Sequence, residues 1–431
     1  MIRLIVTALL TVALALPAQA RGVIRDAEIE YALRQVAQPI LQAAGLPNST
    51  RIIIINDDSL NAFVADSRTI FLHSGLIMRL DNAAQIQAVI AHEAAHIANG
   101  HLTRRPAAAR NAGNIAKLGL VLAGVAAAAG NARAGAGVAI GSTSSAMRNF
   151  FAHTRAEEAS ADQSALRYLA QAGVDPNAMA EVLELFAGQE VLTVGRQDPY
   201  IRSHPLSRDR LRAVQGYAAA VTPRQTDRRA VEYWYARSVG KLSAFLRAPS
   251  WTLRRVRGQQ GEIATLRRAV AHHREPNLSR ALQNIDSLIA MRPNDPYYHE
   301  LKGQFLLEGG QAAAAVASYQ RATQLARRQP LIEAGLGRAL MAAGRYSDAL
   351  PVLERARARD GFNPSLLRDL ATAHGRLGQP GLASVAAAER YASLGRMDDA
   401  RINAERASGL LPRGSSGWLR AQDVLSAVPD R

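Results

Sequence analysis

The segment His92-Glu93-Ala94-Ala95-His96 places two imidazoles four residues apart with a carboxylate between them. On a helix, side chains at this spacing lie on one face, so both rings can reach one metal ion. Imidazole ligands and an open coordination position suit zinc, and the glutamate can act as a base toward water. The pattern therefore predicts a catalytic zinc site. The alternative is a chance match on a buried helix.

The neighbouring residues favour the helix that this site needs. Asp81 or Asn82 can cap its start, and Gly100 is a plausible end. Between them, apolar residues recur at helical spacing, at Ile86, Val89, Ile90 and Ile97. His101 follows His96 by five residues, off the ligand face of such a helix. We expect His101 to support the site or the fold rather than to bind metal.

A catalytic zinc usually has three protein ligands and one open position. Residues 148–172 predict a second helix, on which Glu158 and Asp162 are four residues apart and share a face. Glu158 can bind the metal while Asp162 accepts the other ring N–H of a zinc histidine. Glu157 is the competing ligand, although Ala161 one turn later gives it no such support. The alternative without a metal is a solvated acidic patch, which composition alone would favour.

Other elements must position these helices. Residues 26–44 predict an amphipathic helix. Three strand-like runs follow it, at residues 51–56, 61–65 and 69–73. In zinc peptidases of this build, an edge strand beside the metal binds the substrate as an added strand. Asn61, Ala62 and Phe63 are therefore candidate substrate-binding residues. An ordinary sheet strand is the equally plausible alternative.

The first 20 residues are typical of a secretory signal. Arg3 supplies the positive charge, Leu4 to Leu16 the apolar core, and Ala18-Gln19-Ala20 a cleavage site. The apolar run is shorter than a bilayer-spanning helix requires. The chain has no cysteine, so disulfides and lipid attachment at a cysteine are excluded. We expect export and a mature chain that begins at Arg21.

Length and charge narrow the class of protein further. A chain of 431 residues is long enough for two or more domains. Its net charge of +16 favours peripheral contact with anionic surfaces such as lipid head groups. The chain shows no nucleic-acid-binding motif, and export also argues against a nucleic-acid partner.

Residues 104–150 are unusually apolar. Leu118 to Ala132 and Ala134 to Met147 carry no charge, and each run is shorter than the roughly 20 residues that span a bilayer. One interpretation is a helical hairpin that covers the cleft as a lid or touches a membrane surface. The other is a pair of small-residue helices packed within the domain. The sequence favours neither.

The C-terminal part of the chain repeats with a period of 34 residues from about residue 276 to 412. Three series keep this step: Pro296, Pro330 and Pro364; Gly310, Gly344 and Gly378; and Ala281, Ala315, Ala349 and Ala383. The period and the residue types predict tetratricopeptide repeats, which stack into a solenoid with a concave groove for a partner.

The segments flanking the repeats are less distinctive. Residues 223–275 predict connecting helices, and a final helix pair is expected at about 380–411. Residues 413–431 are expected to form a loose C-terminal tail because Pro412-Arg413-Gly414 interrupts the pattern.

The motif at 92–96, followed by Glu158 and Asp162, resembles the zinc metallopeptidase family that includes HtpX and the CAAX prenyl proteases. The resemblance covers roughly residues 26–220. It implies an α+β fold, in which a mostly helical zincin-type domain with a small sheet spans residues 21–222 and precedes the all-α repeat domain. It also implies one Zn²⁺ per chain on His92, His96 and Glu158, with Glu93 catalytic.

A further element strengthens the resemblance. Ser203-His204-Pro205, with Arg210 six residues beyond His204, is similar to the family's H-P-x-x-x-x-R element. The family implies that His204 can cap the open zinc position and hold the enzyme latent. Arg210 would support His204 or the transition-state oxyanion. Asp162 is sometimes assigned as a proton donor in this family, whereas its position here favours orienting a ligand.

The resemblance also implies a biological role. An exported member with a repeat domain is expected in the periplasm of a Gram-negative bacterium. It would degrade misfolded or stalled outer-membrane β-barrel proteins and assist their assembly through its repeat groove, which would contact the assembly machinery. The alternative is a repeat-domain chaperone or adaptor with a largely latent peptidase. A membrane-embedded prenyl-protease-like enzyme is the third reading. The lack of an apolar run near 20 residues after the signal argues against it.

Overall fold

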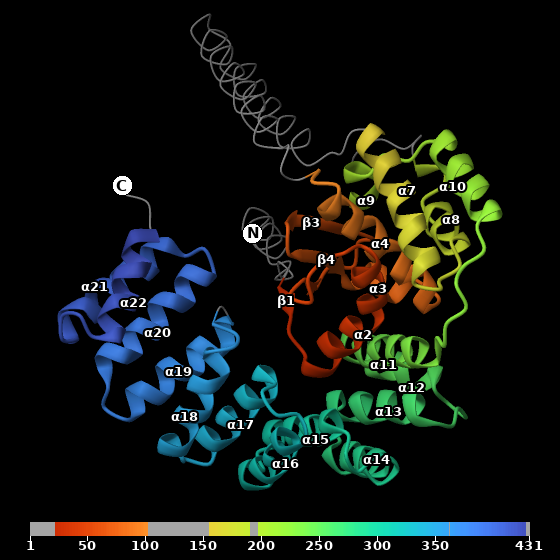
Figure 1. Ribbon diagram of the computed structural model, residues 1–431. Helices are drawn as coiled ribbons and strands as arrows, with labels where there is room; N and C mark the ends of the chain where they lie inside the picture. Colours follow the sequence, from red (N-terminus) through yellow and green to blue (C-terminus); the bar gives the residue numbers. More distant parts are fainter. Residues whose placement is uncertain (1–21, 102–154, 190–196, 362, 428–431) are drawn as a thin grey trace, which may run out of the picture. The chain divides into compact units, whose positions relative to one another are not determined.

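The computed structural model describes residues 22–101, 155–189, 197–361 and 363–427 (Figure 1). The predicted signal at 1–20 and the apolar segment at 104–150 therefore lie outside the described residues. The chain divides into two compact units, one of residues 1–24 and 32–236 and the other of 25–31 and 237–431. None of the helices in the described ranges combines the length and apolar character that crossing a membrane requires.

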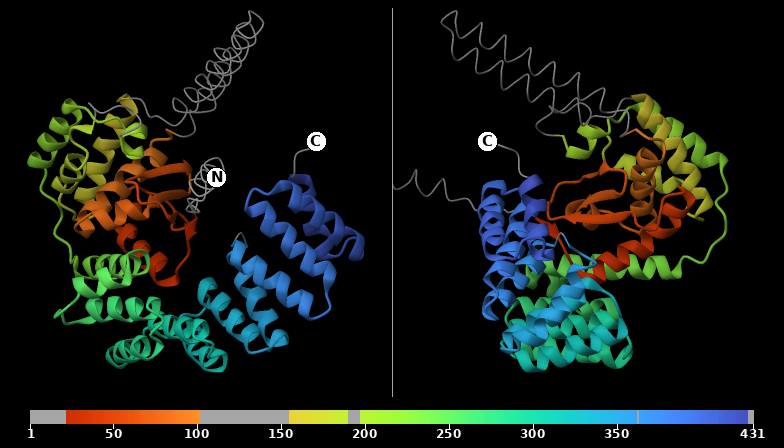
Figure 2. Two further views of the ribbon diagram at one scale, coloured as in Figure 1. Left: turned by 180° about the vertical axis from the view of Figure 1, so that it is seen from behind. Right: turned by 60° about the vertical axis from the view of Figure 1, so that its left-hand side comes forward.

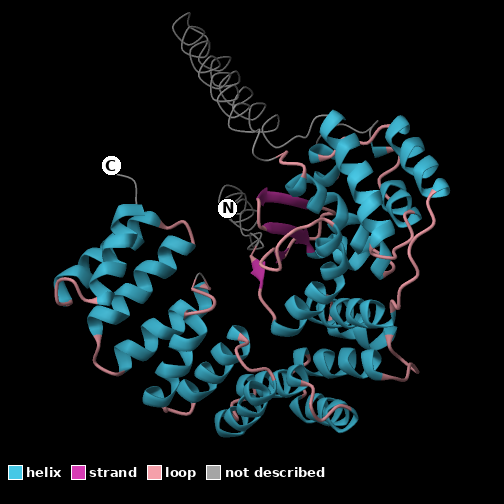
Figure 3. Ribbon diagram, in the orientation of Figure 1, coloured by secondary structure: helices cyan, strands magenta, loops and turns pink. Residues whose placement is uncertain are grey.

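The first unit contains a small four-stranded sheet (Figure 3). Its strands are β1 (Val23–Ile24), β2 (Arg51–Ile55), β3 (Ala62–Asp66) and β4 (Thr69–His73), in the order β1-β2-β4-β3. Strand β2 is parallel to β4, while β1 and β3 pair antiparallel with their neighbours. The order leaves β3 at one edge of the sheet. Ile54, Ile70 and Leu72 are buried on this sheet.

Helices make up the rest of the first unit. They are α3 (Ser74–Arg79), α4 (Ala83–Ala98), α7 (Arg155–Gln171), α8 (Asn177–Glu184), α9 (Pro199–Ser203) and α10 (Arg208–Ala220), with most of α2 (Ala27–Ala43) and the start of α11 (Arg229–Leu246). Helices α7, α8 and α10 lie together beside α4 (Figure 1).

Small side chains bring α4 and α7 close together. Ala91 and Ala95 on α4 and Ala161 and Ala165 on α7 are completely buried. Alanine adds little volume between two helices, so the backbones can approach and longer side chains on the same faces can meet. Helix α4 begins where expected, because the side chain of Asn82 accepts a hydrogen bond from the backbone N–H three residues later.

The second unit is a stack of helices (Figure 2). These are α12 (Pro249–Arg255), α13 (Glu262–Arg274), α14 (Leu278–Met291), α15 (Pro296–Glu308), α16 (Ala312–Leu325), α17 (Pro330–Ala342), α18 (Tyr346–Arg357), α19 (Pro364–Arg376), α20 (Pro380–Ser393), α21 (Met397–Leu410) and α22 (Ser416–Ala427). Each proline of the 34-residue series starts a helix, because proline needs no N–H partner there. The predicted fold class, an α+β domain followed by an all-α repeat region, is confirmed.

Gly303 and Gly337, which are 34 residues apart, lie where paired helices touch. A Cβ atom at Gly303 would come within 2.7 Å of the Tyr319 ring, and one at Gly337 within 2.4 Å of Leu353. These distances are shorter than any packed Cβ contact, so the interhelical spacing depends on glycine at these positions. The 34-residue period therefore reflects helix packing rather than surface composition.

The prediction of a loose C-terminal tail is wrong for most of residues 413–431. Helix α22 packs against α20 and α21, and Ala421 and Val424 join their apolar cluster. A Cβ atom at Gly417 would meet Leu382 at 2.9 Å, so this glycine permits close packing. The sequence break at Pro412 marks a turn between helices, and the stack continues beyond it.

Within the second unit, a buried cluster of charges connects residues 25–31 to helices α11 and α15. The Lys241 ammonium lies 2.8 Å from Asp26, 3.1 Å from Glu28 and 3.7 Å from Glu300. Arg237 pairs with Glu28 and with Asp295, and its side chain is fully buried. Carboxylates outnumber cations in this cluster, so the burial of Glu300 is poorly compensated.

We predict that the stability of the second unit falls as the pH rises through neutrality. Burial raises the pKa of Glu300 to about 7, an effect that Lys241 opposes and that Asp26 and Glu28 increase. Because this pKa is above the ordinary carboxyl value, the stabilisation is complete in acid and is lost as the pH passes 7. Hydrogen exchange of α15 amides, corrected for intrinsic rates, should show protection decreasing about tenfold or more from pH 6 to 8.

Two variants separate Glu300 from other titrating groups. Glu300→Gln should keep α15 equally protected across this range. Glu308→Gln on the same helix should retain the wild-type pH dependence, because the pKa of Glu308 is lowered by its hydrogen bond to His273. Equal pH dependence in the wild type and Glu300→Gln would contradict the assignment.

Candidate metal centre

Helix α4 directs two imidazoles into the interior of the first unit. His92 and His96 are 1% and 0% exposed, and their Nε2 atoms lie 3.0 Å apart. One turn of helix separates the two residues, so their rings project from the same face. The shared face turns toward α7, which supplies the next group.

A carboxylate and a third imidazole complete the cluster. His92, His96, Glu158 and His204 each offer one donor atom, and these atoms all lie within 4.8 Å of one another. Glu158 comes from α7 and His204 follows the end of α9. The Glu158 oxygens lie 3.4 Å from each Nε2 atom on α4, and one of them lies 3.0 Å from His204 Nδ1.

These separations are short enough for the donors to surround a single ion. Donor atoms bonded to zinc at about 2.0–2.1 Å are about 3.3 Å apart when the geometry is tetrahedral. The shortest donor separations run from 3.0 to 3.4 Å, including 3.2 Å between His92 Nε2 and His204 Nδ1, and one donor atom from each of the four residues lies within 4.8 Å of the others. Imidazole nitrogens with one carboxylate oxygen are donors that zinc favours. The residues present therefore fit a zinc ion.

Glu93 lies beside the cluster without binding to it. It is completely buried, and within the described part of the chain neither carboxylate oxygen has a hydrogen-bond partner. The imidazole Nε2 of His204 lies 3.4 Å from one of its oxygens. Burial raises the pKa of Glu93, although His204 and His92 oppose this effect. A buried carboxylate without a hydrogen-bond donor is suited to accept a proton from a molecule that enters the site.

The charges of the cluster depend on one another. Burial lowers the pKa of His92, but the carboxylates of Glu158 and Asp162 outweigh this effect and raise the pKa to about 9. Burial is the largest effect on His96, and Glu158 only partly opposes it, so the pKa of His96 lies well below the ordinary value. Burial alone would raise the pKa of Glu158, yet His204, His92 and Arg210 hold it well below its usual range. The carboxylate therefore stays ionised, as a metal ligand must.

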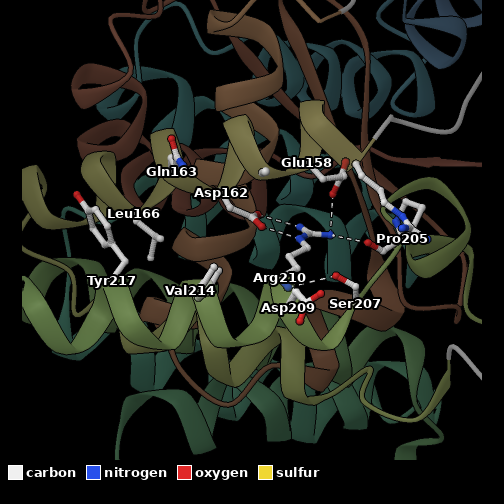
Figure 4. A pocket seen from close by; sticks show the side chains of 13 residues that line it. Glu158, Asp162, Gln163, Leu166, Pro205, Ser207, Asp209, Arg210, Val214 and Tyr217 are labelled. Atoms are coloured by element: carbon white, nitrogen blue, oxygen red, sulfur yellow. Dashed lines mark hydrogen bonds and ion pairs between the residues drawn. The ribbon is translucent and has the colours of Figure 1, made fainter.

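Arg210 on α10 links the supporting residues (Figure 4). Its Nε and one terminal nitrogen donate to the two oxygens of Asp162, at 2.6 and 2.9 Å. Its other terminal nitrogen lies 2.7 Å from Glu158 and donates to the backbone carbonyls of His204 and Pro205. One guanidinium thus joins α10 to α7 and to the segment that carries His204.

Asp162 also contacts a predicted ligand. Its Oδ1 atom lies 3.0 Å from His92 Nδ1, the ring nitrogen that does not face the cluster. The pair is an ionic contact and does not meet hydrogen-bond geometry, and a hydrogen on Nδ1 beside the carboxylate leaves the Nε2 lone pair of His92 for a metal. This contact agrees with the orienting role expected for Asp162.

Glu158 and Arg210 also line a pocket between α7 and α10 with a volume of about 320 Å³ (Figure 4). Leu166, Val214 and Tyr217 form part of its wall.

Sequence reasoning missed the aromatic support of His204. The ring of Tyr200 lies 4.6 Å from the His204 ring and 5.0 Å from Phe186. The Tyr200 N–H donates to the carbonyl of Leu60, in the loop before β3. Tyr200 is four residues before His204, and Pro199 starts the intervening helix. This spacing was the available signal, but a lone tyrosine is more often an ordinary core residue.

The remaining predicted site residues are the competing ligand Glu157 and the candidate substrate-binding residues at 61–63. The described cluster contains Glu158 and does not include Glu157, its competitor. Ala62 and Phe63 lie on edge strand β3, where Ala62 is buried and the Phe63 ring stacks on Phe71 at 5.0 Å. Asn61 precedes the strand, and its amide nitrogen is 3.5 Å from a ring nitrogen of His73. The structure thus places the candidate substrate residues at a sheet edge.

Two family models match the chain. The model of peptidase family M48 matches residues 25–218, and a tetratricopeptide-repeat model matches residues 306–373. The chain therefore carries an M48 metallopeptidase domain followed by tetratricopeptide repeats, the combination that the sequence motifs predicted.

Individual relatives match different shares of the chain. The chain is 26% identical over 372 residues to the β-barrel assembly-enhancing protease of Escherichia coli (strain K12). This match covers 84% of this chain and 75% of the Escherichia coli protein. A putative β-barrel assembly-enhancing protease of Vibrio cholerae is 33% identical over 162 residues, covering 37% of this chain and 32% of its own. The solved structure titled MamA MSR-1 C2 covers 40% of this chain and 97% of its own, with 16% identity and a TM-score of 0.30.

We predict that Asp162→Ala weakens zinc binding by about 10- to 100-fold, because His92 loses the acceptor that orients its ring. The dissociation constant can be measured by competition with a chromophoric chelator. Gln163→Ala is the matched control, since Gln163 is the exposed next residue on α7 and has no contact with the cluster that the structure shows. Equal zinc affinities of the two variants would contradict an orienting role for Asp162.

Proposed function

We propose that this protein is a periplasmic zinc endopeptidase that degrades misfolded or stalled outer-membrane β-barrel proteins. The observation that carries the peptidase part is the cluster of four buried donor residues, whose ligand atoms lie within 4.8 Å of one another, with Glu93 buried beside them. The substrate class and the compartment are supported by the names of the relatives, which are β-barrel assembly-enhancing proteases.

The proposed ligands are His92, His96 and Glu158, with one Zn²⁺ per chain. Zinc held there supplies Lewis acidity toward a peptide carbonyl and toward water. The remaining steps fall to side chains of this chain. Glu93 accepts the proton of the attacking water and delivers it to the leaving amine. Asp162 and Arg210 fix the orientation of His92 and Glu158 through the contacts described above.

His204 is proposed to hold the enzyme latent. Its Nδ1 atom stands among the predicted ligand atoms, and its Nε2 atom faces Glu93. In this position the ring takes the space that a substrate carbonyl needs. When His204 moves away, its N–H can instead stabilise the oxyanion of the tetrahedral transition state. Arg210 is less suited to that role, because its N–H groups already contact Asp162, Glu158 and two backbone carbonyls.

Strand β3 is the proposed place for the substrate backbone. It lies at the edge of the sheet, and its neighbour on the other side is β4. An extended peptide can pair with a free strand edge through backbone hydrogen bonds, which recognise shape rather than sequence. Such recognition suits a protease whose substrates are unfolded or stalled proteins of varied sequence.

The repeat region is proposed to bind partners. Solenoids of this kind present an extended concave surface to other chains. The name of the Escherichia coli relative supports partners among unfolded outer-membrane proteins and the β-barrel assembly machinery. The chain's net charge of +16 also supports peripheral contact with anionic membrane surfaces, and we propose no nucleic-acid partner.

Glu93→Gln tests the chemistry. The amide cannot accept a proton, so we expect cleavage of casein and self-cleavage to fall by about 10²- to 10⁴-fold. Zinc content, measured by mass spectrometry of the metal, should remain at one ion per chain because Glu93 is not a ligand. Persistent cleavage by zinc-loaded Glu93→Gln protein would refute the proposed mechanism.

A second candidate function is that of a chaperone or adaptor in which peptidase activity is incidental. The position of His204 among the ligand atoms favours a latent peptidase and so keeps this candidate open. Complementation of a strain that lacks the protein distinguishes the two functions. The protease proposal predicts that Glu93→Gln fails to restore outer-membrane integrity, whereas full rescue would support the adaptor.

A further inference from the structure

The end of helix α4 folds back over a predicted metal ligand. Gly100 has a φ of +68°, a conformation that favours glycine. The Gly100 N–H donates to the carbonyl of Ile97, and the His101 N–H donates to the carbonyl of His96. This pair of bonds is a Schellman motif, which closes a helix by reversing the chain after its last turn.

The reversal puts His101 against His96. In a Schellman motif the residue after the glycine contacts the side chain three positions before the cap, usually through an apolar contact. Here the contact is polar, because the Nδ1 atoms of the two rings are 2.9 Å apart. Both rings are buried, and their centroids are 5.0 Å apart in an edge-on arrangement. The expectation that His101 lies off the ligand face holds for a continuing helix but not after this reversal.

The contact defines which nitrogen of each ring carries hydrogen. His96 Nε2 faces the cluster, 3.4 Å from Glu158 and 3.0 Å from His92. A metal bound at Nε2 requires the hydrogen of His96 to reside on Nδ1. That N–H donates to His101 Nδ1, so the hydrogen of a neutral His101 ring resides on its Nε2 atom.

The two histidine ligands are therefore supported differently. His92 Nδ1 faces the carboxylate of Asp162, whereas His96 Nδ1 faces a neutral acceptor. An acceptor on the outer nitrogen fixes the orientation of a ligand ring and increases its affinity for metal. Without that acceptor, His96 can rotate or adopt the tautomer with hydrogen on Nε2, which cannot bind a metal.

We propose that His101 is a positioning residue that holds His96 in its metal-binding tautomer, and that the turn at Gly100 is needed to place it. The proposal rests on the zinc site put forward under the proposed function. It assigns a role in metal binding to a helix-capping glycine and the residue after it, outside the H-E-x-x-H motif.

The direct test compares His101→Phe with His101→Asn in the full-length protein. Phenylalanine fills similar space but accepts no hydrogen bond, so zinc should bind about 10- to 100-fold more weakly, as chelator competition would show. Asparagine offers an acceptor oxygen and should recover most of the affinity. Equal affinity of His101→Phe and the wild type would overturn the proposal.

Thermal unfolding separates positioning from general stability. Ligand binding stabilises a folded protein according to its affinity, so the increase in melting temperature on adding zinc should shrink in His101→Phe. The melting temperature of the zinc-free protein should change little. If His101→Phe lowers both temperatures equally and leaves zinc affinity intact, His101 is structural and the proposal fails.

A second pair of variants tests the turn. Gly100→Asn keeps access to positive φ, whereas Gly100→Val does not. We expect weakened zinc binding for Gly100→Val and near wild-type binding for Gly100→Asn, and equal binding by both would contradict the proposal. If the wild-type protein itself binds no zinc, the proposed function fails first. If the wild type binds zinc and none of these variants differs, only the role of His101 fails.

Discussion

The candidate metal centre depends on two buried carboxylates of one helix and on the Arg210 guanidinium that contacts both. Glu158 and Asp162 are 1% and 4% exposed, and burial at this depth strongly disfavours ionised carboxyl groups. Arg210 approaches both, and its own pKa is raised because their attraction exceeds the cost of its burial. Charge-assisted contacts of this geometry keep both carboxylates ionised, one to face the imidazoles and one to orient them.

The close approach of α4 and α7 brings the ionised Glu158 carboxylate next to the imidazoles of α4. Helices α4 and α7 both carry completely buried alanines and pack against each other, and His92 and Glu158 lie within ligand distance. Two residues outside the cluster support its imidazoles. The Tyr200 ring contacts the His204 ring, and His101, which follows α4, contacts His96 through a ring nitrogen. The cluster is thus assembled from three separate segments, which are α4, α7 and the residue that follows α9.

The sequence predicted the local parts of this site better than the nonlocal ones. His92 and His96 could be paired because helical spacing decides their geometry, and Glu158 could be preferred to Glu157 because Asp162 follows one turn later. His204 and Arg210 required resemblance to a family, since nothing local relates residue 204 to residue 92. The role of His101 depends on a chain reversal that a regular helix pattern does not contain. Helix α22 was missed because Pro412 and Gly414 were interpreted as the end of the helical repeats. Gly417, beyond them, lies at a contact between helices.

X-ray absorption at the zinc edge of the purified full-length protein tests the central claim most directly. The account predicts one zinc per chain in a shell of imidazole nitrogens and carboxylate oxygen at about 2.0–2.1 Å. Removal of the Glu158 side chain should abolish that shell, whereas removal of the Glu157 side chain should leave it intact. Absence of stoichiometric zinc, or a zinc shell that survives the loss of Glu158, would contradict the account.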